Sequence, residues 1–330
     1  MNALISEVPK SHPQLDRLAE TVCRDFYSIS SKYNTPVYKK FFSSIRMAFK
    51  IPKHDAYIVH ETFGLLVCKI KKTIRHEKCK IVMRVMNDFF SFERFPWYKR
   101  WFNKWLSTSI DGCITTTDMV LEEVRKNSDI PALAVYEFLQ EKECLRLKPD
   151  FSSRTLLCFA HGDYMRKGVD IAIAIFRQLK SDGILDKCFI LGNVEHLDGR
   201  YKKSLGKEGI FFPGIVDVKK YLESSWIYVQ PSRYDAGASV LLAVMAAGCM
   251  PFVSVKTGNK TIVERVDKNL VIDGFNPEQY AERIKSYMKK DVKELKSLSG
   301  RFKKLIASDY LVENQQENFK KAFHKIMGNL

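Results

Sequence analysis

The stretch that decides the fold is Pro231-Ser-Arg-Tyr-Asp-Ala-Gly-Ala-Ser-Val-Leu-Leu-Ala-Val-Met-Ala-Ala-Gly248, in which an acidic residue and a small-residue turn precede an apolar helix. A flexible turn that opens a helix aims several backbone N–H groups at one point, where the helix dipole favours negative charge. We therefore predict a phosphate or a sugar held by the backbone of Gly237, Ala238 and Ser239. Asp235 beside it can accept hydrogen bonds from hydroxyls, so the pocket indicates a sugar nucleotide. The alternative is a plain turn into a buried helix, which any α/β protein can contain.

A second loop with glycines comes earlier in the chain. Residues 155–160 predict a short buried strand, and the loop His161-Gly-Asp-Tyr-Met-Arg-Lys-Gly168 leads from it into a helix with apolar residues at helical spacing. In open parallel sheets, ligands collect at the carboxyl ends of the strands. Arg166 and Lys167 can therefore neutralise a diphosphate. The alternative is an ordinary solvated pair of surface cations.

These two stretches resemble the C-terminal half of the family 4 glycosyltransferases of the GT-B fold (glycosyl transferases group 1). That family reads roughly strand–G-R-L-x-x-x-K-G–helix and then P-S-x-x-E-x-F-G-x-x-x-L-E-A-M-A-A-G. Three further landmarks occur in the family's order, so the resemblance covers roughly residues 150 to 305; they are Phe189 to Gly192, Ile210 to Gly214 and Ser225 to Ser232.

The chain departs from this pattern at the residues that grip the donor. The family's two acids, spaced E-x7-E, correspond here to Asp235 and Ala243, and alanine has no group with which to bind a ribose. The arginine of G-R-L is missing, and His161 or Gly162 falls near its position. The grip on the donor is therefore altered, or the enzyme is degenerate.

Composition limits the number of domains and the classes of protein and partner that the chain allows. A chain of 330 residues with 45% hydrophobic and 12% aromatic residues suits two globular domains. Its eight cysteines form no C-x-x-C pair and lie partly in apolar runs, which predicts reduced core cysteines in a cytosolic protein. No zinc spacing or histidine cluster indicates a metal. The net charge of +16 predicts an anionic partner, for which nucleic acid, anionic lipid and nucleotide sugar all qualify.

No signal peptide is expected at the start of the chain. Residues 236–255 are uncharged over about the length of a membrane span, but their two glycines and a proline favour a buried helix, a stop and a buried strand.

The first half of the chain alternates strand-like and helix-like segments. Strands are predicted near Ala3 to Val8, His54 to His60, Lys80 to Met86, Asp111 to Thr117 and Ile130 to Tyr136. Helices are predicted near Leu18 to Phe26 and, after a Thr117 cap, over Met119 to Lys126. Asn87 follows the third of these strands where the family often has His-Asp; it can hydrogen-bond but cannot shuttle a proton.

Residues 92–106 carry Trp97, Trp101 and Trp105 at every fourth position, flanked by Lys99, Arg100 and Lys104. A helix would stack the three tryptophans along one side. Such a helix suits a lipid headgroup region. Equally, the stripe can be core packed on a sheet, and one helix can do both.

Alternating strands and helices predict parallel sheets. The resemblance implies an α/β fold of two Rossmann-like domains whose parallel sheets face a central cleft, the GT-B architecture. It places an acceptor-side domain at 1–149 and a nucleotide-sugar domain at 150–307. It also implies a C-terminal helix, 308–330, that returns to the first domain.

The activity implied by the resemblance is metal-independent, retaining transfer of a sugar from a nucleotide sugar to a glycan or lipid-linked acceptor, without a cofactor. Lys167 and Arg166 would stabilise the diphosphate and Asp235 the sugar hydroxyls. The base pocket would be lined by Gly214, Ile215 and Val216. A degenerate GT-B partner subunit and a basic nucleic-acid-binding protein are the alternatives. We expect a cytoplasmic protein, peripheral at the inner membrane face.

Overall fold

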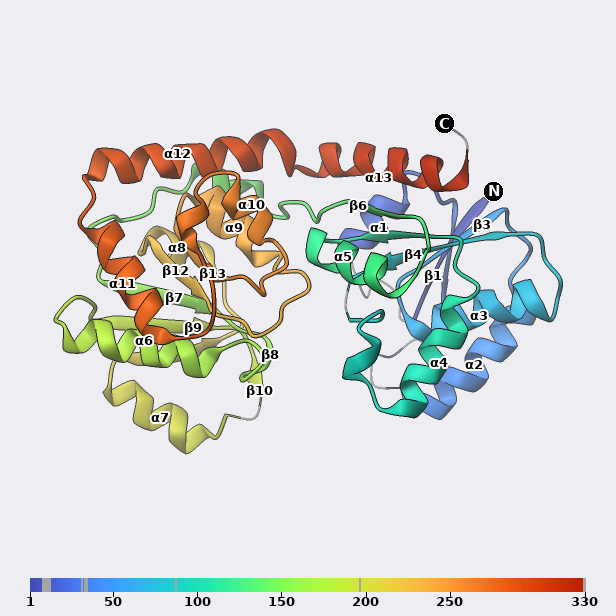
Figure 1. Ribbon diagram of the computed structural model, residues 1–330, viewed down its shortest axis with the longest axis horizontal. Helices are drawn as coiled ribbons and strands as arrows, with labels where there is room; N and C mark the ends of the chain where they lie inside the picture. Colours follow the sequence, from blue (N-terminus) through green and yellow to red (C-terminus); the bar gives the residue numbers. More distant parts are fainter. Residues whose placement is uncertain (8–12, 31, 33–34, 87, 196, 329–330) are drawn as a thin grey trace. The chain divides into compact units, whose positions relative to one another are not determined.

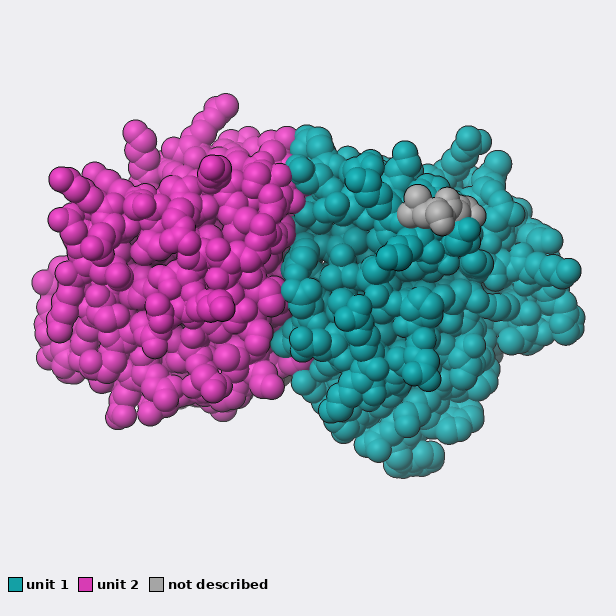
Figure 2. Space-filling model, turned by 45° about the horizontal axis from the view of Figure 1, so that its top comes forward, with its two compact units in different colours: residues 1–137, 312–330 teal, residues 138–311 magenta. Residues whose placement is uncertain are grey.

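The computed structural model describes residues 1–7, 13–30, 32, 35–86, 88–195 and 197–328. The chain forms two compact units, Met1–Glu137 with Val312–Leu330, and Phe138–Leu311 (Figure 2). The domain boundaries expected from the sequence, 1–149, 150–307 and 308–330, stay predictions.

The first unit is built on one sheet of six parallel strands in the order β2-β1-β3-β4-β5-β6 (Figure 1). Its central strands are buried along most of their length, as expected for a sheet covered on both faces. The strands are β1 (Asn2–Ser6), β2 (Asp25–Ser28), β3 (Ala56–Val59), β4 (Lys80–Val85), β5 (Gly112–Thr115) and β6 (Ala132–Ala134).

Helices cover both faces of this sheet. Right-handed crossovers place the helices that follow β2, β3 and β4 on one face, where α2 and α4 both lie against α3. On the other face α13 packs on α1 and reaches β4, β5 and β6. The helices are α1 (Pro13–Ala19), α2 (Val37–Lys50), α3 (Thr62–Thr73), α4 (Trp97–Ser107), α5 (Asp118–Asn127) and α13 (Val312–Met327), with a 3-10 turn η1 (Phe92–Arg94).

The predicted helix over Leu18 to Phe26 is wrong. Helix α1 ends at Ala19, and Phe26 lies in the edge strand β2, opposite Leu4 of β1. Phe26 and Tyr27 have aromatic side chains that favour a strand, and pairing with β1 satisfies their backbone groups. The predicted cap of α5 is confirmed, since the Thr117 hydroxyl accepts the Val120 N–H at 3.3 Å.

The tryptophans of α4 are not core residues. Trp97 is 80% exposed, Trp101 65% and Trp105 39%. Helix α4 contacts the unit instead through Asn103 and Leu106, which are three positions apart and both buried. The interpretation of the stripe as core is therefore wrong, because the buried line of α4 runs along another side of the helix.

The second unit contains a second sheet of six parallel strands, in the order β11-β9-β7-β12-β13-β14. Its strands are β7 (Thr155–Phe159), β9 (Lys187–Leu191), β11 (Ile210–Gly214), β12 (Ile227–Gln230), β13 (Met250–Ser254) and β14 (Val271–Ile272). A separate pair joins β8 (Gly162–Asp163) to β10 (Val194–Glu195). The predicted α/β fold with two Rossmann-like domains and parallel sheets is confirmed.

The helices of the second unit follow the strands in alternation. They are α6 (Val169–Ser181), α7 (Gly199–Lys207), α8 (Lys219–Glu223), α9 (Val240–Ala247), α10 (Lys260–Glu264), α11 (Pro277–Met288) and α12 (Val292–Asp309), with 3-10 turns η2 (Lys142–Arg146) and η3 (Lys268–Leu270). Helix α9 is apolar and almost wholly buried, and Gly248 ends it in a left-handed conformation. The interpretation of residues 236–255 as helix, stop and strand is thus confirmed. No helix in the described ranges is both long and apolar enough to cross a membrane.

The register of the second sheet brings two loops together. Strand β7 pairs in parallel with β12, Leu156 opposite Ile227. The loops that follow these two strands, 160–168 and 231–239, therefore leave the sheet side by side at its carboxyl edge. All eight cysteines are buried and free, which confirms the prediction that they are core residues.

Candidate functional site

Lys167 and Asp235 meet where the two loops leave the sheet. Lys167 Nζ lies 2.6 Å from Asp235 Oδ2, and the two side chains are 15% and 7% exposed. The two residues predicted to serve a diphosphate and sugar hydroxyls thus form one nearly buried ion pair. The sequence placed them in one pocket but did not indicate that they neutralise each other.

A buried chain of hydrogen bonds fixes the Asp235 carboxylate. Gln230 Nε2 donates to the same Oδ2 at 2.8 Å, and the Tyr228 hydroxyl donates to Gln230 Oε1 at 2.6 Å. Burial, with smaller contributions from Cys158 and Asp235, raises the pKa of Tyr228 well above its usual value, so the phenol stays a donor. Asp235 Oδ1 accepts no hydrogen bond from any described residue.

Loop 161–168 is pressed against the start of loop 231–239 at a glycine. Gly168 has a φ of +70°, and a Cβ there would lie 2.1 Å from the carbonyl oxygen of Pro231. Asp163 Oδ1 accepts the Arg166 N–H at 2.7 Å, and the Asp163 carbonyl accepts the Lys167 N–H at 3.1 Å. The loop is therefore held from within, with Lys167 at its inner side.

Arg166 points elsewhere. Its side chain is exposed, and one guanidinium N–H donates to the Tyr234 carbonyl at 3.2 Å. Arg166 and Lys167 thus do not converge on one atom. Arg233, which sequence reasoning left aside, forms a bidentate ion pair with Asp170 at 2.8 and 2.7 Å and ties the second loop to α6.

The turn 236–239 presents backbone donors. Among the described residues, the N–H groups of Gly237, Ala238 and Ser239 find no acceptor. Ser239 stands at the N-terminus of α9, and its side chain makes no capping bond. The turn predicted to hold a phosphate or a sugar therefore offers open N–H groups beside the Lys167–Asp235 pair.

A third loop, 255–259 after β13, clamps this turn, and sequence reasoning missed it. Asn259 Nδ2 donates to the Ala238 carbonyl at 3.1 Å, and the Gly258 N–H donates to the Asp235 carbonyl at 2.7 Å. A Cβ on Gly258 would lie 2.2 Å from the Ala236 carbonyl oxygen. The available signal was Thr257-Gly-Asn259, which begins three residues after the end of the buried strand β13, at the carboxyl edge that β7 and β12 already share.

The other predicted residues lie farther out or outside the described residues. His161 is exposed, and the Gly162 N–H donates to the Asn193 carbonyl at 2.9 Å where β8 pairs with β10. Gly214 is the last residue of β11, and Ile215 and Val216 follow it. Strand β11 is separated from β7 by β9, and Ile215 is 79% exposed. Asn87 lies outside the described residues.

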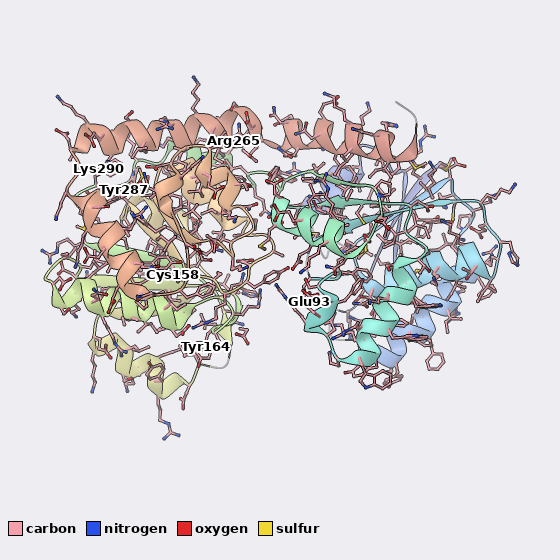
Figure 3. All side chains as sticks on the ribbon, in the orientation of Figure 1. Glu93, Cys158, Tyr164, Arg265, Tyr287 and Lys290 are labelled. Carbon is pink, nitrogen blue, oxygen red and sulfur yellow. The ribbon has the colours of Figure 1, made fainter. Side chains whose placement is uncertain are left out.

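Burial prevents the Cys158 thiol near the site from acting as a nucleophile. Cys158, labelled in Figure 3, lies on β7 in the second unit. Burial raises the pKa of its thiol to about 12, and Lys167 lowers it only in part. The cysteine is therefore neutral. Among the residues that the structure describes, no three His, Cys, Asp or Glu side chains are grouped to hold a metal ion.

Residues 146–305 match the model of the family described as Glycosyl transferases group 1. The match confirms the resemblance to the glycosyl transferases group 1 over this part of the chain, while the narrower assignment to family 4 stays a prediction. No curated protein matches the chain.

Solved structures confirm the GT-B fold over the whole chain. A sucrose-phosphate synthase from Thermosynechococcus elongatus is 12% identical, with a TM-score of 0.76 and coverage of 100% of this chain and 99% of that one. HepE from Anabaena, in complex with UDP-glucose, is 12% identical, with a TM-score of 0.79 and coverage of 98% and 100%. WaaG, a glycosyltransferase involved in lipopolysaccharide biosynthesis, is also 12% identical, with a TM-score of 0.70 and coverage of 98% and 99%. At this identity the likeness shows the fold alone.

Proposed function

We propose that the chain transfers a sugar from a nucleotide-sugar donor to a glycan or lipid-linked acceptor, with retention of configuration and without a metal. The observation that carries the proposal is the Lys167–Asp235 pair beside the open N–H groups of Gly237 to Ser239. It supplies a cation, backbone donors and a carboxylate within one group of loops. The HepE structures, described as complexes with UDP-glucose, with UDP, and with UDP and glucose, support the same class of donor.

Each part of the donor would bind the protein group of complementary charge. The diphosphate takes the Lys167 ammonium and the N–H groups of the turn, which stabilise the charge that develops on the leaving group. Asp235 keeps Oδ1 for a donor hydroxyl while Oδ2 stays with Gln230. Arg166, exposed at the loop tip, serves the outer phosphate. This electrostatic work is why the proposal needs neither a metal nor another cofactor.

The remaining predicted residues have outer roles in the proposal. His161 and Gly162 flank the phosphate loop, and Gly214 to Val216 line the base pocket. Asn87 hydrogen-bonds on the acceptor side. The protein would act in the cytoplasm.

The acceptor proposal rests on α4. Trp97 and Trp101 are largely exposed, and Lys99, Arg100 and Lys104 stand between the tryptophans. A helix of this kind suits contact of 92–106 with an anionic membrane at the inner face, where a lipid-linked acceptor is held. Cosedimentation with anionic vesicles should fall in Trp101→Ser/Trp105→Ser protein of unchanged fold. Equal binding by the variant removes this contact.

A degenerate, non-catalytic partner subunit is the second candidate, and Ala243 favours it. This residue stands on α9 where the family has its second acid, and it offers no polar side chain. Release of free sugar or transfer to an acceptor by the purified protein excludes this candidate. Donor binding without any turnover favours it.

A thermal-shift screen with UDP-, GDP- and ADP-sugars tests the donor proposal. A ligand at one hundred times its Kd stabilises the folded state by about 2.7 kcal/mol, which raises the Tm by about 5–10 °C for a domain of this size. Lys167→Met should abolish the rise, whereas Lys296→Met, an exposed lysine on α12, should keep it. No rise with any activated sugar contradicts the proposal.

A further inference from the structure

Helix α2 exposes large apolar side chains on a face that no described residue of the first unit covers. Three of them share one stripe, at positions i, i+4 and i+11: Tyr38 is 60% exposed, Phe42 66% and Phe49 55%. Another side of the helix carries the small buried residues Ser44 and Ala48, on the side where α2 packs on α3. The helix is therefore seated by its small side and leaves its aromatic side in solvent.

A stripe of cations runs beside the aromatic stripe. Lys39, Arg46 and Lys50 follow at i, i+7 and i+11, so they share one face of the helix. In the described part of the chain, none of the three makes an ion pair. Helix α2 contains no acidic residue. Cations that make no ion pair with described residues and stand next to exposed aromatics favour an external anionic surface.

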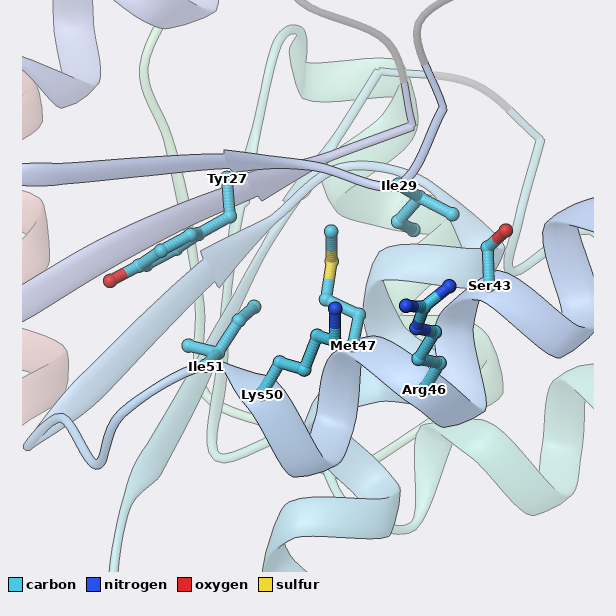
Figure 4. A pocket seen from close by; sticks show the side chains of 7 residues that line it. All are labelled: Tyr27, Ile29, Ser43, Arg46, Met47, Lys50 and Ile51. Atoms are coloured by element: carbon cyan, nitrogen blue, oxygen red, sulfur yellow. The ribbon is translucent and has the colours of Figure 1, made fainter.

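Two of these cations open onto a cavity. A space of about 370 Å³ lies between α2 and the edge strand β2. Figure 4 shows the charged ends of Arg46 and Lys50 pointing from α2 toward the segment that carries Tyr27 and Ile29. Ser43 adds a hydroxyl, and Met47 and Ile51 close the apolar side. The cavity thus combines two positive charges, a hydroxyl donor and an apolar wall.

Helix α4 repeats the pattern on the other side of α3. It too lacks an acidic residue, and its exposed tryptophans stand beside Arg100 and Lys104. Trp101 and Trp105 stack at 6.5 Å, with an angle of 6° between their rings. The acids nearest to α4 in sequence are Glu93 of η1, labelled in Figure 3, and Asp111, each four residues from an end of the helix. Helices α2 and α4 thus flank α3 on one face of the sheet, each with an aromatic and a cationic stripe (Figure 1).

We propose that α2 docks on an anionic lipid bilayer, with Tyr38, Phe42 and Phe49 in the interfacial layer and a lipid phosphate in the cavity between Arg46 and Lys50. This rests on, and extends, the membrane contact proposed above for α4. Aromatic rings and cations in adjacent stripes match the layering of acyl boundary and headgroup phosphate. A second copy of the chain fits this face poorly, because its cations would meet the same cations.

The test is cosedimentation of the full chain with vesicles of phosphatidylglycerol and phosphatidylcholine, against pure phosphatidylcholine. Arg46→Gln/Lys50→Gln should weaken binding to the anionic vesicles about thirtyfold, since each cation near such a surface contributes about fivefold. Phe42→Ser/Phe49→Ser should weaken it about tenfold or more. The matched controls, Lys293→Gln/Lys296→Gln and Ile74→Ser/Val292→Ser, change the same charge or apolarity at exposed positions and should bind normally.

Three outcomes of the vesicle assay overturn the proposal: equal binding to both vesicle types, binding unchanged in both α2 variants, or an equal loss in the controls. A dimer that the Phe42→Ser/Phe49→Ser change splits, with no vesicle binding, assigns the face to a second copy and also overturns it. A salt-dependent mobility shift of RNA by the protein, without vesicle binding, assigns the face to a nucleic acid and likewise overturns the proposal. The Tm rise with an activated sugar is measured on each variant. It should persist in all of them, so loss of membrane binding and failure of the donor proposal are told apart.

Discussion

Replacing Lys167 by methionine removes the positive partner of a carboxylate that has almost no access to water. Lys167 Nζ and Asp235 Oδ2 are 2.6 Å apart, and the Asp235 side chain is 7% exposed. After the replacement, Gln230 Nε2 is the remaining donor to that oxygen among the described residues. A stability loss is therefore expected even without substrate, and a loss of turnover in this variant alone would not isolate a role at the diphosphate.

The size of the loss follows from the geometry. At an effective dielectric constant of about 20, two unit charges 2.6 Å apart attract by about 6 kcal/mol, and most of this offsets their desolvation. Removing one partner of a buried pair typically costs about 3–5 kcal/mol. Because Lys167 is 15% exposed and water can reach the vacated position, we expect about 3 kcal/mol. That corresponds to a Tm lower by about 6–12 °C.

The double variant Lys167→Met/Asp235→Asn separates stability from catalysis. In a double-mutant cycle with both single variants, urea unfolding should give a coupling free energy of about 2 kcal/mol, because the double variant leaves no unpaired charge at either position. If Lys167 serves the leaving diphosphate, turnover of the double variant with the best donor should lie about 100-fold or more below that of Asp235→Asn alone. Equal turnover in these two variants would refute the diphosphate role. A coupling free energy near zero would refute the buried ion pair itself.

Three further outcomes are expected. Gly258→Ala should lower the Tm and abolish the donor-induced rise in Tm, because its Cβ would lie 2.2 Å from the Ala236 carbonyl oxygen; an unchanged rise would separate the clamp loop from the donor site. Thr117→Ala should reduce the free energy of unfolding by about 1 kcal/mol in urea, since it removes the cap bond to the Val120 N–H. The eight buried thiols should react with a thiol reagent slowly in the native protein and all together after unfolding; fast labelling of the native state would contradict their burial, which raises the pKa of Cys113 and Cys249, for example, to about 12.

The sheets could be predicted because parallel strands covered on both faces read as short apolar runs bounded by polar or glycine-bearing loops. Strand β7 and helix α9 are examples, and each was expected within two residues or so of its observed limits. Strand β2 was missed because an edge strand of four half-exposed residues carries no such run. Register with β1, a contact distant in sequence, decides its structure.

The exposure of α4 shows the limit of periodicity. A repeat at every fourth residue says that three tryptophans share a side, but not which side faces the unit. That choice was made by Asn103 and Leu106, which contact the rest of the unit and leave the stripe outside. Helix α2 adds a second case, since its buried line consists of small residues that a hydrophobic pattern does not single out.

The sequence predicted individual residues of the candidate site, but not the ion pair and hydrogen bonds that join them. The two loops could be brought together from sequence, because each follows a strand of one parallel sheet. The ion pair joins residues 68 positions apart, and no local pattern states whether a lysine faces a ligand or an aspartate. The clamp through Asn259 was likewise missed, because it acts on a backbone carbonyl and leaves no partner in the sequence.

Asp235→Asn tests the free oxygen that the donor proposal assigns to a sugar hydroxyl. Lys167 Nζ and Gln230 Nε2 both donate to Oδ2, so the amide oxygen of an asparagine must take that position. Its NH2 group then stands where Oδ1 was and turns an acceptor into a donor. A sugar hydroxyl that donates there loses a hydrogen bond to a charged group, so kcat/KM should fall by about 10- to 150-fold for that sugar and much less for an epimer lacking it. Unchanged kcat/KM and sugar preference would remove Asp235 from the donor site and leave its pair with Lys167 purely structural.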